Sequence, residues 1–370
     1  MAHIRRARSG QGWEARYRDQ IGRERSRTFS TRRMAQGFAD RQSADVQRGE
    51  FRDPRLARLT VDHWAELWWA TTVDLKPNTR GAYESIVHRH FEPTFGSRGV
   101  AGINRTDVAR FVADLSASGI GPGTVRSIVS VLRLVFATAL GAGPITQNPV
   151  VGVRLPRSAA SETLFLVPEQ IVALADAIDP RYRTLVLFAA YTGIRAGEIE
   201  ALRVQRVDLG RGAVDVVESL ADVRGRLVFG PTKTYSRRTV RLPAFLCDLV
   251  AAHLADRPVD PDALVFVGEQ GGPMRHNLFY ARRFKPAVRA AGLPERLRFH
   301  DLRHTCAALL IAQGAHPRAM MERLGHSSVQ VTIDRYGHLL PSLDDTLVEG
   351  LDDTYRSSVS DDRSRMRVAA

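Results

Sequence analysis

Three short segments of the chain carry charged side chains where neither a core nor a loop requires them. The segments are Tyr191–Glu198 with Arg195, Gly230–Thr234 with Lys233, and Phe299–Thr305 with His300 and Arg303. Arginine binds phosphate oxygens through a planar fork of donors, and lysine does so as a point charge. If the fold brings the segments together, they indicate chemistry on a phosphate group.

Two further segments complete a recognisable order. Leu324–Ser328 contains His326, and Thr332–His338 contains Tyr336. The order Arg, Lys, His-x-x-Arg, Leu-Gly-His and Tyr closely resembles the catalytic domain of tyrosine recombinases of the phage integrase family. The resemblance runs from Leu164 to Leu340 and implies cleavage and rejoining of DNA through a 3′-phosphotyrosyl bond.

By this resemblance the catalytic residues are Arg195, Lys233, His300, Arg303, His326 and Tyr336. Arginines suit the non-bridging oxygens because a guanidinium keeps its charge. Tyr336 is the nucleophile, and His300 is its base by family analogy. Lys233 can protonate the leaving 5′ oxygen, which an arginine cannot do. Glu198 is expected to position Arg195, and Asp301 to orient His300.

A metal site is the alternative explanation for the histidines. Five of the 11 histidines fall within residues 300–338, and His300 and His304 are spaced i, i+4 as in a zinc helix. However, Asp301 stands where that signature has glutamate, and Arg303 would place a cation beside the metal. We therefore expect no metal and no cofactor.

Composition points to a polyanionic partner. The chain of 370 residues has 53 Lys and Arg against 40 Asp and Glu, a net charge of +13, and nucleic acid is the leading candidate. Two cysteines and no signal peptide indicate the cytoplasm. The most apolar stretch, 125–140, is interrupted by Arg126 and Arg133. It is expected to be too short to span a bilayer, which takes about 20 apolar residues, so no membrane role is expected.

The N-terminal residues 1–56 hold more than half of the excess charge. Alternation over Trp13–Tyr17 and Arg23–Ser30 predicts a β-hairpin, followed by a helix from about Thr31 to Arg48; a basic disordered tail is the alternative. By resemblance this is an arm-site DNA-binding domain, with the candidate DNA contacts Arg16, Arg18, Arg23, Arg25 and Arg27.

The fold class expected is mainly α with a small β-sheet in the catalytic domain. Helical periods at 60–72, 78–91, 105–115 and 124–140 predict a helical core-binding domain over 57–152. An exposed linker is expected at 150–162. Helices at 168–177 and 181–192, a strand-rich middle at 207–242 and further helices predict a mixed α+β catalytic domain over 163–355, before a polar tail at 356–370. Within the strand-rich middle, residues 230–234 are expected to form a hairpin-like turn between 226–229 and 238–242.

The function expected is that of a site-specific recombinase, an integrase of a phage or mobile element in a bacterium. Its expected partners are double-stranded DNA, three further copies in a homotetramer on DNA, and possible excisionase and host DNA-bending proteins. Two alternatives remain open: a non-catalytic DNA-binding regulator with the same fold, and DNA relaxation like that of a type IB topoisomerase.

Overall fold

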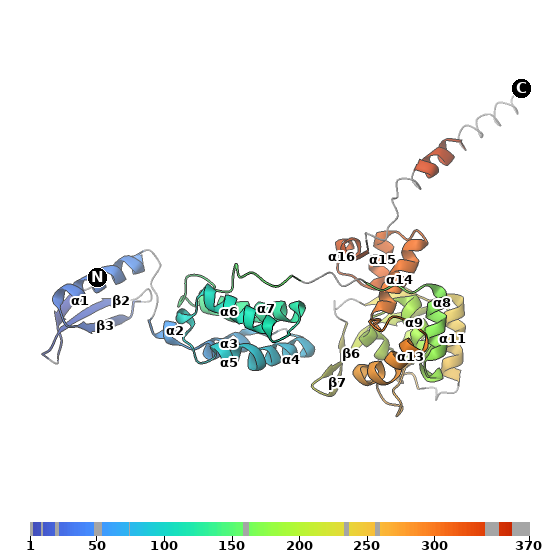
Figure 1. The fold of residues 1–370 in the computed structure, drawn as a ribbon, viewed down its shortest axis with the longest axis horizontal. Helices are drawn as coiled ribbons and strands as arrows, with labels where there is room; N and C mark the ends of the chain where they lie inside the picture. Colours follow the sequence, from blue (N-terminus) through green and yellow to red (C-terminus); the bar gives the residue numbers. More distant parts are fainter. Residues whose placement is uncertain are drawn as a thin grey trace, which may run out of the picture. The chain divides into compact units, whose positions relative to one another are not determined.

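The computed structural model describes residues 3–8, 10–18, 22–47, 54–73, 75–157, 163–232, 237–255, 260–336 and 348–356. The chain divides into two compact units, Met1–Ser161 and Glu162–Ala370, and each is described by itself (Figure 1). The finer division into three domains and a tail stays a prediction.

The first unit begins with a small sheet covered by a helix. Strands β1 (His3–Arg6), β2 (Trp13–Arg18) and β3 (Glu24–Phe29) pair antiparallel in chain order. Helix α1 (Arg32–Gln47) buries Ala35 and Ala39 against Ala15, and Thr31 caps it by accepting a hydrogen bond from the Met34 amide at 3.3 Å. The hairpin and helix are as predicted, whereas β1 was not predicted.

The candidate DNA contacts of this sheet are divided between its two faces. Ala15, which α1 covers, lies opposite Arg27, and so Arg27 shares the face that the helix covers. Its guanidinium lies 5.4 Å from the Phe38 ring centroid. Arg16 lies on the opposite face and bonds Glu24 at 3.0 Å. The candidates therefore do not form one surface: by strand alternation Arg16 and Arg18 share one face and Arg25 and Arg27 the other, while Arg23 precedes β3.

The rest of the first unit is a cluster of helices. The elements are α2 (Pro54–Arg58), α3 (Val61–Thr71), α4 (Pro77–Ile86), the π-helical η1 (Val87–Phe91), α5 (Glu92–Phe95), the 3₁₀ turn η2 (Val100–Gly102), α6 (Arg105–Ala117) and α7 (Pro122–Gly141). Their apolar faces meet around Trp64, Phe111 and Phe136, which are buried. The helical periods predicted from sequence are observed with ends shifted by a few residues.

Helix α7 corrects the prediction about apolar length. It spans 20 residues and is long and apolar enough to cross a membrane, the one such helix in the described part of the chain. Ile128, Leu132 and Val135 on this helix are fully buried against the other helices of the unit. We therefore interpret α7 as the central helix of a core.

The predicted exposed linker is partly wrong. Val150 is buried and Leu155 packs against the helical core. Arg126 of α7 donates a hydrogen bond to the Pro156 carbonyl at 3.1 Å. Residues 150–157 thus belong to the first unit, because their apolar side chains pack on its helical core. Residues 158–162 lie outside the described residues.

The second unit is larger and mixed. Its elements are α8 (Pro168–Ala177), α9 (Pro180–Thr192), α10 (Ala196–Glu200), η3 (Val204–Arg206), β4 (Val207–Asp208), β5 (Ala213–Val216), β6 (Glu218–Val223), β7 (Arg226–Pro231), β8 (Arg238–Arg241), α11 (Ala244–Ala255), α12 (His276–Phe279), η4 (Tyr280–Phe284), α13 (Lys285–Ala290), α14 (Asp301–Ala312), α15 (Pro317–Leu324) and α16 (Val329–Tyr336). A helical segment also covers 348–356.

The strands pair differently from the prediction. Residues 226–229 and 238–242 were expected to flank a hairpin turn containing Lys233. Instead β7 pairs with β6, while β8 pairs with β5 in a separate sheet of order β4-β5-β8. The segment around Lys233 therefore connects two sheets. Lys233 itself lies outside the described residues.

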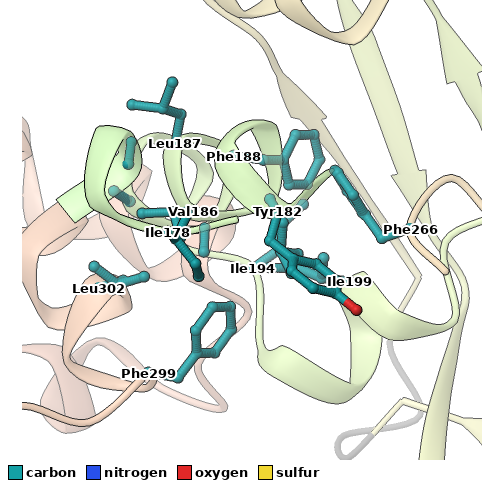
Figure 2. Close-up of a cluster of buried hydrophobic side chains, with 14 of the residues drawn as sticks. Ile178, Tyr182, Val186, Leu187, Phe188, Ile194, Ile199, Phe266, Phe299 and Leu302 are labelled. Atoms are coloured by element: carbon teal, nitrogen blue, oxygen red, sulfur yellow. The ribbon is translucent and has the colours of Figure 1, made fainter. Parts of the chain in front are cut away.

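One hydrophobic cluster supports both arginine-bearing segments. Ile194 precedes α10 and Ile199 lies within it, while Phe299 and Leu302 lie on either side of the start of α14; all four are buried in this cluster with Phe188 (Figure 2). Arg195 directly follows Ile194, and Arg303 directly follows Leu302. Since buried neighbours fix the backbone on each side, the core positions both guanidiniums.

Candidate active site

A left-handed turn directs Arg195 into the site. Helix α9 ends at Gly193, whose φ is +67°. A Cβ on Gly193 would lie 2.5 Å from Leu324 Cδ2, so both the backbone conformation and the space require glycine. Two residues later Arg195 begins α10, where its guanidinium bonds the Glu198 carboxylate at 3.0 Å.

Glu198 holds two guanidiniums at once. Its other carboxylate oxygen accepts a hydrogen bond from Arg238 at 2.7 Å, and its side chain is 1% exposed. Burial alone would raise the pKa of Glu198, but the hydrogen bond and charge of Arg238, together with Arg195, hold the pKa below its ordinary value. Glu198 therefore carries a full negative charge that fixes Arg195.

The Leu-Gly-His segment is tied to the same network. Arg195 donates to the Gly325 carbonyl at 2.7 Å, and Arg238 donates to the Arg323 carbonyl at 3.1 Å. Gly325 caps α15 in the left-handed conformation, and the guanidinium of Arg238 lies 3.0 Å from where its Cβ would stand. The residue next in the chain is His326. Its segment is thereby held against Arg195.

Arg303 lies deeper than Arg195. Its residue is 3% exposed, and it donates to the Gly193 carbonyl at 2.6 Å. Burial, and then repulsion from Arg195, lower the pKa of Arg303 to about 9. The group is still charged at neutral pH. The three guanidiniums of Arg195, Arg238 and Arg303 outnumber the single Glu198 carboxylate and leave positive charge suited to a phosphate.

Tyr336 lies between two imidazoles. Its side chain is 1% exposed, and its hydroxyl lies 2.8 Å from His304 Nδ1. The ring stacks on His326 with centroids 6.2 Å apart and an interplanar angle of 15°. His326 in turn forms a hydrogen bond of 2.8 Å, through Nδ1, with the hydroxyl of Thr332, one turn before Tyr336 on α16. The negative form of the phenol also interacts favourably with the charge of Arg303.

The structure therefore brings four predicted residues to one place: Arg195, Arg303, His326 and Tyr336. Of the other predicted residues, Glu198 bonds Arg195 as expected, and Lys233 lies outside the described residues. His300 lies edge-on to His304 with 5.0 Å between ring centroids. The Asp301 carboxylate accepts hydrogen bonds from the backbone and the guanidinium of Arg298, at 2.8 Å each, and its predicted orientation of His300 stays a prediction. Among the described residues no group of three or more histidine, cysteine, aspartate or glutamate side chains could hold a metal ion.

Comparison with known proteins agrees with this geometry. The model of the phage integrase family matches residues 165–342. The integrase of Mycobacterium phage FRAT1 is 30% identical over 283 residues, which cover 74% of this chain and 83% of that protein. The chain belongs to the phage integrase family of tyrosine recombinases. It is an enzyme of site-specific DNA recombination.

Solved structures confirm the predicted fold class. The Tn1549 transposon integrase in complex with a circular intermediate DNA has a TM-score of 0.71 at 20% identity, covering 80% of this chain and 99% of that chain. The lambda integrase tetramer bound to a Holliday junction has a TM-score of 0.57 at 19% identity, covering 90% and 94%. At these identities the likeness shows the fold of the recombinase.

Sequence reasoning missed the role of Arg238. On β8 it shares the inward face with buried Val240, and strand alternation could have predicted that. An arginine pointing inward needs an acidic partner, and Glu198 is that partner. Thr332 was also not singled out, although it lies one helical turn from Tyr336 and so on the same face of α16.

Replacing Arg238 by glutamine is expected to destabilise the recombinase. The change removes one partner of a buried ion pair, which costs about 3–5 kcal/mol of unfolding free energy, to be measured by urea denaturation. The matched control is Arg183→Gln, which breaks the exposed pair with Asp176 and is expected to cost at most about 1 kcal/mol. Equal effects of the two changes would contradict the structural role assigned to Arg238.

Proposed function

We propose that Tyr336 attacks a DNA phosphate and forms a 3′-phosphotyrosyl bond, and that the recombinase thereby integrates or excises a phage or mobile element. The observation that carries this proposal is the position of the buried phenol, which stacks on His326 and interacts with the charge of Arg303. A covalent link to the enzyme conserves the energy of the phosphodiester bond, and so rejoining needs no nucleotide.

The cationic residues have distinct proposed roles. Arg195 and Arg303 bind the non-bridging oxygens, on which negative charge gathers in the transition state. His326, whose Nδ1 forms a hydrogen bond with Thr332, donates to the same oxygens. Lys233 protonates the 5′ oxygen, and His300 belongs to the proton-transfer machinery of the nucleophile.

The remaining domains are proposed to bind DNA. We assign residues 1–56 to arm-type sites, 57–152 to the core site and 163–355 to catalysis, with the tail 356–370 outside these domains. The net charge of +13 supports phosphate contacts along duplex DNA, with an affinity that falls steeply with salt. The recombinase acts in the bacterial cytoplasm, bound to DNA.

We also propose that four copies assemble on DNA, as in the lambda integrase tetramer on a Holliday junction. The exposed side chains of Val348, Leu351 and Tyr355 offer an apolar stripe for contact with a neighbouring copy. An excisionase and a host DNA-bending protein are the proposed accessory partners.

A nicked suicide substrate tests the proposal. After cleavage, the short fragment that carries the freed 5′-hydroxyl diffuses away and cannot be rejoined. The covalent complex therefore accumulates and is detected as a denaturant-stable adduct. We expect the adduct to survive EDTA and, after nuclease and protease digestion, to place the nucleotide on the peptide containing residue 336. DNA binding without an adduct would favour a regulator, and relaxation of supercoiled plasmid without strand exchange would favour a topoisomerase.

A further inference from the structure

An imidazole outside the predicted catalytic set contacts the nucleophile. His304 follows Arg303 on α14, is 5% exposed, and has Nδ1 2.8 Å from the Tyr336 hydroxyl. The base expected by family analogy was His300, one turn earlier. His300 is exposed and its ring lies edge-on to His304, with 5.0 Å between centroids.

We propose that His304 is a catalytic residue and the direct general base for Tyr336. The proposal rests on the proposed function, because it assigns a proton acceptor to the attack by Tyr336. A base must lie within about 2.6–3.2 Å of the proton-bearing atom, and His304 Nδ1 meets this criterion before DNA is bound.

Attack by Tyr336 moves one proton to His304 and one proton to the leaving 5′ oxygen. The phenol O–H bond breaks, and its proton passes to Nδ1 of a neutral His304 whose other nitrogen, Nε2, already carries hydrogen; the product is an imidazolium. The phenolate oxygen forms a bond to phosphorus while the bond from phosphorus to the 5′ oxygen breaks, and that oxygen takes a proton from the general acid. During rejoining a 5′-hydroxyl attacks phosphorus, its proton returns to the acid, and His304 returns the proton to the departing tyrosine.

The surrounding charges favour this direction of transfer. The titratable and charged groups around the pair are His300 and Arg303 on α14, Tyr336 itself on α16, and His326 stacked on the Tyr336 ring. The Arg303 cation disfavours a second positive charge nearby and so favours the neutral form of a neighbouring imidazole, the form that accepts a proton. The same cation favours the phenolate once it forms.

The substitution His304→Asn distinguishes a role of His304 as a hydrogen-bond partner of the phenol from a role as its proton acceptor. The asparagine amide reaches the position of Nδ1 and can still bond the phenol, but it cannot accept a proton. The assay is single-turnover adduct formation on the nicked suicide duplex from about pH 5.5 to about pH 9, a range that spans imidazole titration. Thermal unfolding and DNA binding of each variant are measured in parallel, so that a misfolded protein is recognised.

We expect His304→Asn to form adduct about 10²- to 10⁴-fold more slowly at neutral pH. The wild-type rate should level off above the pH range of imidazole titration. The rate of the variant should instead keep rising toward the ordinary phenol pKa of about 10. A fluorinated tyrosine at position 336, whose phenol is more acidic, should restore the rate of His304→Asn. His316→Asn is the matched control, since the exposed His316 caps α15 and asparagine also caps helices.

Two results overturn the inference. One is a wild-type rate and pH profile for His304→Asn. The other is a slow variant whose rate still levels off as in the wild type, because His304 then only positions the phenol. The proposed function fails separately: in that case the wild-type protein itself forms no adduct, or the adduct does not depend on Tyr336.

Discussion

Tyr336→Phe is expected to abolish the covalent adduct, with a loss of more than about 10⁴-fold in cleavage. The change removes the one oxygen that attacks phosphorus and keeps the ring, which packs against His304 and His326. Because the His304 hydrogen bond is lost, the free energy of unfolding should fall by only about 1–3 kcal/mol. Denaturing gels on the suicide substrate, with urea unfolding alongside, measure both effects.

The matched control for this prediction is Tyr355→Phe. Tyr355 is 68% exposed, and loss of its hydroxyl is expected to leave cleavage within about two-fold of the wild-type rate. DNA binding should remain unchanged in both variants. An adduct that persists in Tyr336→Phe would show that another residue is the nucleophile.

Arg303→Gln is expected to reduce cleavage by about 10³- to 10⁵-fold, the effect typical of a guanidinium that neutralises a transferring phosphoryl group. Arg303→Lys should recover little, since a lysine cannot bond the Gly193 carbonyl and two phosphate oxygens with one planar fork. Single-turnover cleavage measures the loss. Arg318→Gln, on the exposed side of α15, is the control, and cleavage by Arg303→Gln within about tenfold of wild type would contradict the prediction.

The same change should remove a pH dependence of stability. Burial and Arg195 lower the pKa of Arg303 from its ordinary value to about 9. A base whose pKa falls on folding destabilises the folded protein fully below that lowered value, and the cost shrinks progressively as the pH rises above about 9 toward the ordinary pKa. Urea unfolding should therefore show the wild type gaining stability relative to Arg303→Gln above about pH 9. Parallel pH curves would contradict the lowered pKa.

The order of the motifs allowed the family to be predicted, because each residue type matches a separate requirement of phosphate chemistry. Helical segments were equally accessible, since apolar residues at helical spacing identify a buried face locally. Gly193 marked the end of α9 by the conformation that a left-handed cap needs.

Strand pairing was not accessible in the same way. Alternation shows which face of a strand is buried but not which strand lies beside it. For that reason residues 226–229 and 238–242 suggested one hairpin, although β7 and β8 pair with different strands. The contact between His304 and Tyr336 joins residues 32 positions apart, and in the sequence His304 showed only its spacing from His300.

The short helix α16 carries two residues of the site, Thr332 and Tyr336. Thr332 engages His326, and Tyr336 engages His304 one turn later. A displacement of these eight residues that withdraws the phenol also releases the imidazole intended for the phosphate. A single motion of α16 would therefore remove nucleophilic attack and charge stabilisation simultaneously. A subunit with α16 undocked is expected to be inactive in both respects.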